Sequence, residues 1–397
     1  MPEPPTILQI IPELDTGGAE RSTVEIAEAI VRGKGRALVM AQGGRMVTAL
    51  TDAKGEFIAF PAASKNPATI LLNAKRIATT IRQQNVQLIQ AESRAPAWSA
   101  FIAARQCKIP FVTTYHGAYK EQNALKKLYN SVMARSDIVI ANSKFTANLI
   151  ATRYGTPASR LRVIYRGVDT RQFEPGAVTL DRVAALRAHW GVRDGERIVL
   201  HAARLTSWKG QTYLIEAARR MRRDGDNFVV ILAGDAQGRT GYEAQLRRQI
   251  AECGMQDVIR LVGHVADMPA AYIAAHVTFV ASVEPEAFGL AAAEAQAMGC
   301  PVISTNIGAT PETVMAPPLV PASQRTGWLV SPRDTAGYEQ ALREVLNLSP
   351  AEREAIGLRA RAHVTANFTT AQMQKNTLAV YDHLLGTTLS KTFEREI

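Results

Sequence analysis

The sequence predicts an α/β protein made of two doubly wound parallel sheets. Short β-rich runs alternate with helical patterns along the chain, which is typical of parallel strands with helices on both faces. This plan occurs twice, and an irregular polar stretch over residues 170–195 separates the two halves. The length of 397 residues suits two or three domains. We therefore expect two domains that face a cleft, joined by a linker.

Each half predicts its own series of elements. In the first half the expected strands are Ile7–Pro12, Ala37–Ala41, Glu56–Phe60, Val86–Ala91, Phe111–Tyr115, Asp137–Ala141 and Arg162–Tyr165, with helices over 19–32, 68–84, 96–106, 122–135 and 144–154. In the second half they are Arg197–Ala203, Phe228–Ala233, Val258–Val262, Val277–Ala281, Val302–Ser304 and Gly327–Val330, with helices over 210–223, 242–253, 267–275, 288–298 and 334–346.

The domain boundaries follow from this series. We expect Rossmann-like domains over 1–178 and 179–365, then a tail over 366–397 with a helix from Gln372 to Leu385. Ligands of such sheets bind outside the carboxyl ends of the strands. A motif that directly follows a predicted strand is therefore a better candidate for ligand binding.

Composition disfavours a membrane-spanning or secreted protein. No apolar run reaches the roughly 18 residues that a spanning helix needs, and the N-terminus lacks the basic start and apolar stretch of a secretory signal. Cys107, Cys253 and Cys300 lie far apart without metal-site spacing, which favours buried, reduced cysteines. We expect a cytoplasmic protein.

The formal charge of +10 lies entirely in the first half. Residues 1–178 hold 23 Lys and Arg against 13 Asp and Glu, whereas residues 179–397 hold 23 of each. This asymmetry favours an anionic partner such as a membrane surface, a phosphorylated lipid or nucleic acid. A generally basic composition is the alternative. No recognition motif or aromatic cluster supports a nucleic-acid binder.

Two carboxylates, Glu286 and Glu294, flank the start of an alanine-rich helix. The first backbone N–H groups of a helix form an anion site, so the acids on either side suit hydroxyl groups instead. Eight residues of helix span roughly 12 Å, about the distance from a hexose across a pyrophosphate to a ribose. The segment indicates a sugar-nucleotide site. A glycosidase acid pair is the alternative, but there both acids converge on one bond.

Cationic and glycine-rich segments follow other predicted strands. Arg204 and Lys209, the latter before Gly210, lie after the first strand of the second half and could clamp a pyrophosphate. Gly17 and Gly18 follow the first strand of the chain and open a helix, where the backbone can approach an anion closely. The chain lacks G-x-G-x-x-G, which disfavours a dinucleotide cofactor.

Weaker signals also lie at strand ends. His116 follows the strand Phe111–Tyr115 and could bond a sugar hydroxyl. Backbone groups at Gly234, and at His264 and Val265 after the next strand, could read a nucleobase edge.

Two further signals have simple structural explanations. Ser143 is expected to cap a helix. Asp224 and Asp226 have the spacing of a metal-chelating pair but precede a strand, so a tight turn explains them and no metal is expected.

Together these residues resemble the GT-B glycosyltransferases of family 4. The family's acid pair with seven intervening residues appears as Glu286 and Glu294, and its Arg-x(4)-Lys-Gly element as Arg204 to Gly210. Its glycine loop appears as Gly17 and Gly18, and its histidine appears as His116. The resemblance covers about residues 6–385.

The resemblance implies a role for each matching position in the second half. Glu294 would hold the ribose and Glu286 the donor sugar, while the backbone N–H groups of Phe288, Gly289 and Leu290 would lie near the sugar and phosphates. Arg204 and Lys209 would bind the diphosphate.

In the first half, Gly18 would pack against the diphosphate and His116 would touch the sugar near its reacting carbon. The family is retaining and metal-independent, which implies no cofactor besides the nucleotide sugar as co-substrate. Its N-terminal domain usually takes the acceptor, and its last helix crosses back onto that domain.

The acceptor is expected to be a glycan or a lipid-linked molecule of lipopolysaccharide or surface polysaccharide assembly. In the segment Lys120–Arg135, apolar Leu125, Leu128 and Val132 share a face, with lysines nearby. It could lie on an anionic inner membrane surface; a core-facing helix with a basic solvated side is the alternative. Lys75, Arg76 and Arg82 form a second basic stretch.

Several alternatives stay open at this point. UDP-glucose, UDP-galactose, UDP-GlcNAc and GDP-mannose all remain as donors. A non-catalytic nucleotide-sugar binder or scaffold is the second functional hypothesis.

Overall fold

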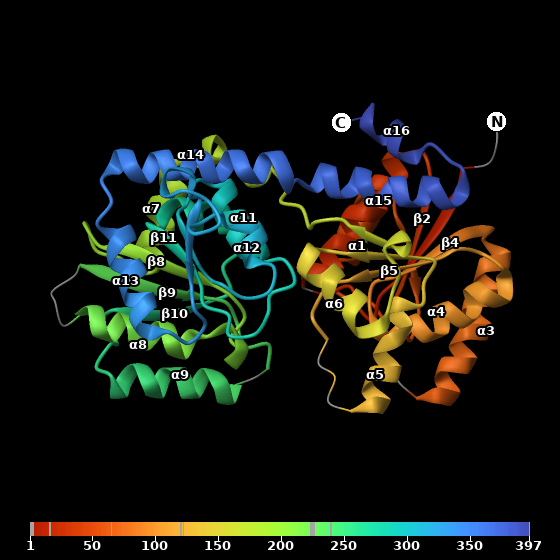
Figure 1. Ribbon diagram of the computed structural model, residues 1–397, viewed down its shortest axis with the longest axis horizontal. Coiled ribbons are helices and arrows are strands. Elements are labelled where there is room, and N and C mark those ends of the chain that lie inside the picture. The colour runs from red at the N-terminus through yellow and green to blue at the C-terminus, as the bar shows by residue number, and fades with distance from the viewer. Residues whose placement is uncertain are drawn as a thin grey trace. The chain divides into compact units, whose positions relative to one another are not determined.

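The computed structural model describes residues 4–15, 17–64, 66–119, 121, 123–222, 227–238 and 240–396. It divides into two compact units (Figure 1). Unit 1 is the chain up to Gly167 together with the segment from Thr370 onward, and unit 2 is Val168–Thr369.

Unit 1 contains a seven-stranded parallel sheet in the order β3-β2-β1-β4-β5-β6-β7. Its strands are β1 (Thr6–Ile10), β2 (Arg36–Ala41), β3 (Glu56–Ala59), β4 (Val86–Ala91), β5 (Phe111–Tyr115), β6 (Ile138–Ala141) and β7 (Leu161–Val163). Its helices are α1 (Gly18–Arg32), α2 (Val47–Asp52), α3 (Pro67–Gln83), α4 (Arg94–Cys107), α5 (Ala124–Asn130), α6 (Lys144–Tyr154), α15 (Thr370–Leu385) and α16 (Leu389–Glu394). The strand order reverses between β1 and β4, so the carboxyl ends of these two strands form the switch point where such sheets bind ligands.

Unit 2 contains a six-stranded parallel sheet in the order β10-β9-β8-β11-β12-β13. Its strands are β8 (Arg197–Ala202), β9 (Phe228–Ala233), β10 (Ile259–Gly263), β11 (Val277–Val280), β12 (Val302–Thr305) and β13 (Gly327–Val330). Its helices are α7 (Leu180–His189), α8 (Gln211–Arg222), α9 (Thr240–Glu252), α10 (Met268–Ala274), α11 (Leu290–Ala297), α12 (Thr310–Thr313), α13 (Thr335–Leu346) and α14 (Pro350–Asn367). The switch point here lies between β8 and β11.

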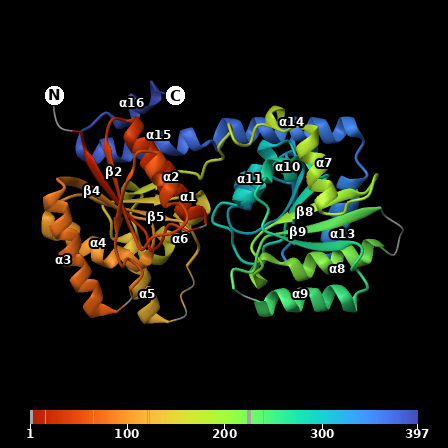
Figure 2. The same ribbon diagram turned by 180° about the vertical axis from the view of Figure 1, so that it is seen from behind.

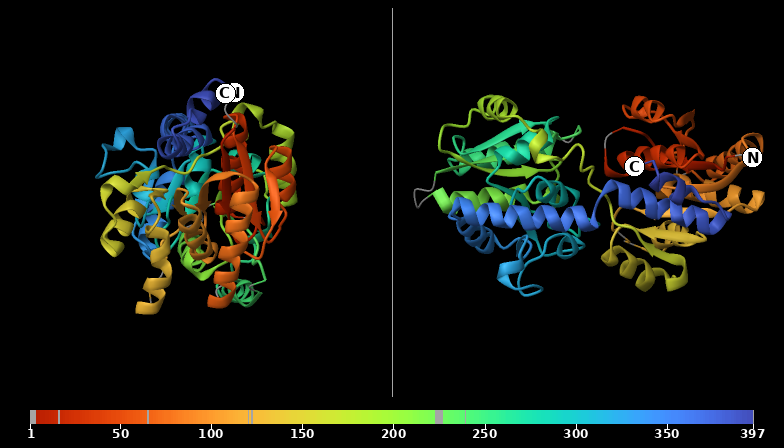
Figure 3. Two further views of the ribbon diagram at one scale, coloured as in Figure 1. Left: turned by 90° about the vertical axis from the view of Figure 1, so that its right-hand side faces the viewer. Right: turned by 90° about the horizontal axis from the view of Figure 1, so that it is seen from above.

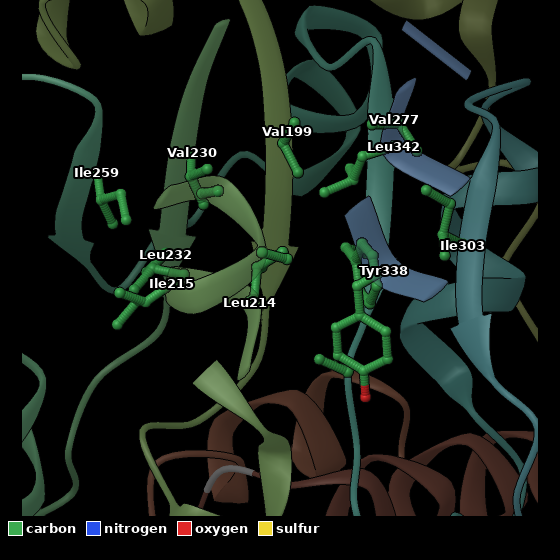
Figure 4. Close-up of a cluster of buried hydrophobic side chains, with 14 of the residues drawn as sticks. Val199, Leu214, Ile215, Val230, Leu232, Ile259, Val277, Ile303, Tyr338 and Leu342 are labelled. Carbon is green, nitrogen blue, oxygen red and sulfur yellow. The ribbon is translucent and has the colours of Figure 1, made fainter. Parts of the chain in front are cut away.

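The sheets are buried on both faces, which explains their continuous apolar strands. In unit 2 one face is covered by α8 and α13, whose Leu214, Tyr338 and Leu342 pack on Val199 and Val230 of the sheet (Figure 4). All of these side chains are fully buried.

The predicted α/β class with two doubly wound parallel sheets is confirmed. Every expected strand lies within two residues of an observed one. Among the helices, the expected 122–135 is shorter, because α5 ends at Asn130 and a 3₁₀ turn over Ser131–Ala134 follows. Helices α2, α7, α12, α14 and α16 were not expected.

The stretch 170–195, expected to be irregular, contains α7. The Thr179 side chain caps this helix by accepting a hydrogen bond from the backbone N–H of Arg182. None of its residues is buried, so the sequence shows no apolar stripe there. The guanidinium of Arg182 instead holds the helix to Asp267 through N–O distances of 2.7 and 2.9 Å.

The unit boundary lies after Gly167 rather than after residue 178. The backbone N–H of Val168 donates to the Phe368 carbonyl at 2.8 Å, and Phe173 packs on Tyr272 with ring centroids 6.2 Å apart. These contacts place residues 168–178 in unit 2.

The tail joins unit 1 from Thr370, not from residue 366, because α14 runs to Asn367. Helix α15 packs on α1 (Figure 2). There the Gln374 amide donates to the carbonyl of Glu25 at 2.7 Å.

Candidate active site

In unit 2 a lysine and a glutamate meet at the carboxyl end of the sheet. Lys209 Nζ donates to Glu286 Oε1 at 2.5 Å, and the two side chains are only 17% and 13% exposed. The hydroxyl of Ser282 donates to the same carboxylate oxygen. The structure thus brings together two of the predicted residues that lie 77 positions apart.

Local backbone geometry holds both partners in place. After β8 the chain makes a 3₁₀ turn over Ser207–Lys209, and Gly210 then has a φ of 75°. A Cβ on Gly210 would lie 1.9 Å from the carbonyl oxygen of Ala281, so only glycine lets this loop pass. The carbonyl of Glu286 accepts a hydrogen bond from the N–H of Ala309 at 2.9 Å.

The electrostatics keep this carboxylate ionised. Burial raises the pKa of Glu286, but the charge and hydrogen bond of Lys209, the Ser282 hydroxyl and the charge of Arg204 outweigh it, so the net pKa lies below the usual value. Arg204 therefore belongs to the same cluster. Its Nη1 also donates to Gln237 Oε1 at 3.4 Å.

Nearby, burial lowers the pKa of His201 to about 4. This imidazole therefore adds no positive charge at neutral pH.

Helix α11 begins directly beyond this cluster. Gly289 is its N-cap with a φ of 88°, and Leu290 is its first residue. Phe288 is buried against Phe368 with ring centroids 5.4 Å apart. Glu294 lies on the helix, 9% exposed, and accepts a hydrogen bond from the Tyr272 hydroxyl at 3.2 Å. The two acids thus lie on either side of a helix N-terminus, as the sequence predicts.

The remaining predicted residues of unit 2 follow neighbouring strands. Gly234 has a φ of 151°, and a Cβ there would lie 2.1 Å from the Ala203 carbonyl oxygen, so close packing of β8 and β9 already requires this glycine. His264 is exposed and Val265 half-buried on the loop after β10. β10 is the edge strand of the sheet.

In unit 1 the glycine pair lies at the start of α1. Gly17 is the N-cap in extended conformation, with φ 169°. A Cβ on Gly18 would lie 3.2 Å from a guanidinium nitrogen of Arg166, a side chain that is 6% exposed. Sequence reasoning missed Arg166, although it too closely follows a strand.

His116 is paired with a residue that sequence reasoning also missed. Its Nε2 lies 2.7 Å from Glu92 Oε2, with side chains 10% and 2% exposed. Glu92 directly follows β4 as His116 follows β5, and β4 and β5 are neighbours in the sheet. The shared carboxyl-end position was the signal available in the sequence. The carboxylate takes Nε2–H, and Nδ1 of the imidazole is buried without a hydrogen-bond partner among the described residues.

Two secondary predictions have separate outcomes. Ser143 caps α6 by accepting a hydrogen bond from the N–H of Thr146 at 3.0 Å, as predicted. Asp224 and Asp226 lie outside the described residues. Within the described ranges, no group of three or more His, Cys, Asp or Glu side chains is placed to hold a metal ion.

Comparison with known proteins places this chain in a family. The model of "Glycosyltransferase Family 4" matches residues 16–172, and that of "Glycosyl transferases group 1" matches residues 183–363.

Among curated relatives, the D-inositol 3-phosphate glycosyltransferase of Geodermatophilus obscurus is 33% identical over 67% of this chain and 60% of that protein's length. The lipopolysaccharide core biosynthesis mannosyltransferase LpsB of Rhizobium meliloti is 30% identical over 64% of this chain and 68% of its own. The chain thus spans less than two thirds of the first of these relatives.

Solved structures agree over nearly the whole chain. A glycosyltransferase from Rickettsia africae is 32% identical with a TM-score of 0.88, covering 97% of this chain and all of that one. The Anabaena protein HepE, solved with UDP-glucose, has a TM-score of 0.82 at 24% identity, covering 96% of this chain and all of its own. The chain belongs to the glycosyltransferases of family 4, which have the GT-B fold.

Proposed function

We propose that this glycosyltransferase moves a hexosyl unit from a nucleoside diphosphate sugar to a glycan or lipid-linked acceptor, with retention of the anomeric configuration and without a metal. The ion pair of Lys209 with Glu286 beside the N-terminus of α11 is the observation that carries the proposal. A cation and helix amides suit a diphosphate, and an ionised carboxylate suits sugar hydroxyls.

The proposed reaction breaks the bond between the anomeric carbon and the diphosphate oxygen. The acceptor oxygen bonds to this carbon on the same face, and its proton passes to the leaving phosphate oxygen. Arg204, Lys209 and the first N–H groups of α11 would stabilise the charge that develops on the diphosphate, usually the largest electrostatic demand of such a step. Glu294 would hold the ribose hydroxyls.

Nucleotides are expected to raise the melting temperature of the protein. A ligand stabilises the fold according to its affinity, by about 2.7 kcal/mol at a hundred times its Kd. A thermal-shift panel of UDP, GDP and the sugar nucleotides named above would show one base raising Tm above the others. HepE, bound to UDP-glucose, favours UDP, whereas LpsB is a mannosyltransferase. No shift with any diphosphate, or turnover abolished by EDTA, would contradict the proposal.

Removing the Glu92 carboxylate is expected to lower kcat more than it changes KM. We propose that His116 bonds a hydroxyl of a sugar substrate through Nδ1, and Glu92 fixes the ring for this contact. In Glu92→Ala the imidazole loses its partner, and a misplaced group costs up to about a hundredfold. Glu92→Gln, which still accepts from Nε2–H, should recover much of kcat.

The matched control for Glu92 is Glu56→Ala, which removes an exposed carboxylate of β3 that pairs with Arg36. It should leave kcat unchanged. Equal activity of Glu92→Ala and the wild type would rule out this positioning role.

Several observations support an acceptor at an anionic membrane surface. We propose that the enzyme acts in lipopolysaccharide or surface polysaccharide assembly at the inner face of the membrane. LpsB acts in lipopolysaccharide core biosynthesis. Unit 1 holds 25 Lys and Arg against 14 Asp and Glu. Of the predicted apolar face, Leu125 and Leu128 on α5 are 79% and 54% exposed, whereas Val132 is buried in the core. Lys120 lies outside the described residues.

A second pair of exposed leucines lies on α3 of unit 1. Leu71 and Leu72 on α3 are 58% and 48% exposed, and the first turns of α3 and α5 protrude together (Figures 1 and 3). The basic side chains of Lys75, Arg76 and Arg82 are exposed on α3. Over the described residues, no helix combines the length and apolar character that crossing a membrane requires.

Vesicles that contain phosphatidylglycerol are expected to co-sediment with the protein, and the double variant Leu125→Ser with Leu128→Ser should weaken this binding about a hundredfold or more. Each buried leucine contributes about 1.5–3 kcal/mol when it leaves water. Leu180→Ser is the matched control, because Leu180 is 84% exposed on α7 of unit 2. Equal binding to vesicles with and without anionic lipid would refute the proposal that the positive charge of unit 1 attracts the protein to the membrane.

A further inference from the structure

The tail helix α15 contributes a buried tyrosine to the interior of unit 1. The Tyr381 hydroxyl donates a hydrogen bond to Oε1 of Gln90 on β4, a residue 291 positions away. The Gln90 amide in turn donates from Nε2 to the hydroxyl of Thr114 on β5 at 2.7 Å. All three side chains are buried. They join the tail to two neighbouring strands, and we call these three residues the tail brace.

The contact between Gln90 and Thr114 lies directly behind the pair of Glu92 and His116. Glu92 follows Gln90 by two positions, and His116 follows Thr114 by two. Side chains two positions apart along an extended strand point to the same face of a sheet. The backbone N–H of Glu92 still donates to the Ile10 carbonyl of β1 at 3.0 Å, so the sheet pairing reaches this residue. The two side-chain contacts are therefore successive links between the same two segments.

The pair itself is held by one described hydrogen bond between its side chains. Glu92 Oε2 lies 2.7 Å from His116 Nε2, whereas Glu92 Oε1 is buried without a hydrogen-bond partner among the described residues. His116 Nδ1 is likewise buried without such a partner. The geometry of the pair therefore depends on this mutual hydrogen bond and on how β4 and β5 hold the two backbones.

The hydroxyl of Tyr381 is a permanent donor. Burial and, after it, the negative charge of Glu92 raise the pKa of Tyr381 well above its usual value, so the phenol keeps its proton at neutral pH. Its hydrogen bond fixes Oε1 of the Gln90 amide and thereby directs Nε2 to Thr114. A buried carbonyl oxygen without a donor is costly, so loss of the hydroxyl should turn the amide and weaken its bond to Thr114.

We propose that the tail brace positions the pair of Glu92 and His116 for the transfer reaction. The inference rests on the proposed contact of His116 with a sugar substrate. Groups in an active site must be held to within about 0.5 Å by the side chains behind them, and the tail brace supplies such support at the ends of β4 and β5. Its members are positioning residues, because they act through the pair and do not touch the substrate.

Nuclear magnetic resonance of the imidazole groups tests the positioning without any substrate. A hydrogen bond to a carboxylate moves an imidazole N–H proton downfield, and the signal that is missing from His116→Gln identifies the proton of His116. In Tyr381→Phe and Thr114→Val, which each remove one hydroxyl of the tail brace, this signal should shift or broaden. An unchanged His116 signal in both variants would overturn the proposal.

Tyr338→Phe is the matched control for Tyr381→Phe. Tyr338 is also fully buried, and its hydroxyl accepts a hydrogen bond from the backbone N–H of Arg333 in unit 2 at 3.0 Å. The same substitution therefore removes one buried hydrogen bond elsewhere in the chain. It should leave both the His116 signal and kcat unchanged. Equal changes in the two variants would mean that loss of any buried hydroxyl has this effect, which would also overturn the proposal.

Steady-state kinetics test whether the tail brace acts through the pair. Turnover is followed as release of nucleoside diphosphate from UDP-glucose or GDP-mannose, with water as the acceptor. Tyr381→Phe should lower kcat about tenfold and change KM by less than about twofold, since a misplaced group costs up to about a hundredfold. In a Glu92→Ala background the same substitution should lower kcat by less than about twofold further, because the pair is already broken. The full loss in that background would show that Tyr381 acts independently of Glu92, against the proposal.

These outcomes separate the inference from the proposed function. If Glu92→Ala lowers kcat but Tyr381→Phe does not, the tail brace has no positioning role and the proposed function stands. If Glu92→Ala leaves kcat unchanged, the proposed contact of His116 fails and the inference fails with it. Nucleotides should raise Tm equally in the wild type and in Tyr381→Phe, which also shows that the variant folds. Nucleotides that fail to stabilise the wild type would contradict the proposed function alone.

Discussion

Replacing Glu286 with glutamine is expected to lower kcat by about a hundredfold or more while the protein stays folded. Glutamine keeps the shape of the side chain, but it removes the charge that Lys209 and Arg204 surround. Loss of one preorganised electrostatic contact in an active site typically costs 10²–10³ in kcat. Lys209→Met should lower kcat at least as much, since it removes the cation proposed to stabilise the departing diphosphate.

Stability and activity should respond differently in these variants. Lys209→Met leaves the Glu286 carboxylate, 13% exposed, without its nearest cation. Breaking a buried ion pair from one side typically costs about 3–5 kcal/mol. The double variant Lys209→Met with Glu286→Gln removes both charges, so its free energy of unfolding should return toward that of the wild type.

The double variant separates the two explanations of the ion pair. If Lys209 and Glu286 act on substrate, kcat stays low although stability recovers. If the pair only holds the loop, kcat recovers with stability. Arg220→Met is the control, because it breaks an exposed ion pair with Glu339 and should change stability by less than about 1 kcal/mol. Steady-state kinetics measure kcat, and urea unfolding measures stability. A wild-type kcat in Glu286→Gln would contradict the assignment of Glu286 to the active site.

The strands could be predicted because a strand that is buried on both faces is apolar at nearly every position. Phe228–Ala233, for example, is apolar at every position and fully enclosed. The motifs after such strands then had a predictable location, since the carboxyl ends of parallel strands meet at one edge. This is why Arg204, Lys209 and Glu286 could be grouped from the sequence before their contacts were known.

Helices without an apolar stripe could not be found this way. α7 buries none of its residues, and the contact that holds it, between Arg182 and Asp267, joins positions 85 residues apart. α14 is different, because its start shows a local signal: Ser349 and Glu352 form a capping box around Pro350.

In the site, the sequence showed that Glu92 and His116 both follow strands, but it did not show that they pair with each other. Glu92 and His116 lie 24 positions apart, and nothing in either segment names the other as its partner. The order of β4 and β5 in the sheet decides it. For Gly234, a glycine at a strand end led us to predict a ligand contact, and the structure adds a packing reason: a Cβ there would lie 2.1 Å from the Ala203 carbonyl oxygen.

Gly210→Ala is expected to lower the free energy of unfolding by about 2–5 kcal/mol. Two effects add. A φ of 75° costs a residue with a Cβ about 1–2 kcal/mol, and overpacking typically adds about 1–3 kcal/mol. The new Cβ would lie 1.9 Å from the Ala281 carbonyl oxygen, which belongs to the backbone after β11 and cannot rotate away.

Gly254→Ala isolates the first effect. Gly254 also lies in unit 2 with a φ of 63°, but nothing lies within 4 Å of a Cβ there. Gly254→Ala should lose only the conformational term, about 1–2 kcal/mol. The difference in unfolding free energy between the two variants, measured in urea, therefore gives the energetic cost of the close approach at Gly210. If Gly210→Ala were no worse than Gly254→Ala, the loop could move away from β11 freely, and the contact could not be what positions Lys209. If the difference is found, the glycine after the lysine is explained by the path of the backbone, and its ligand contacts are not needed to account for it.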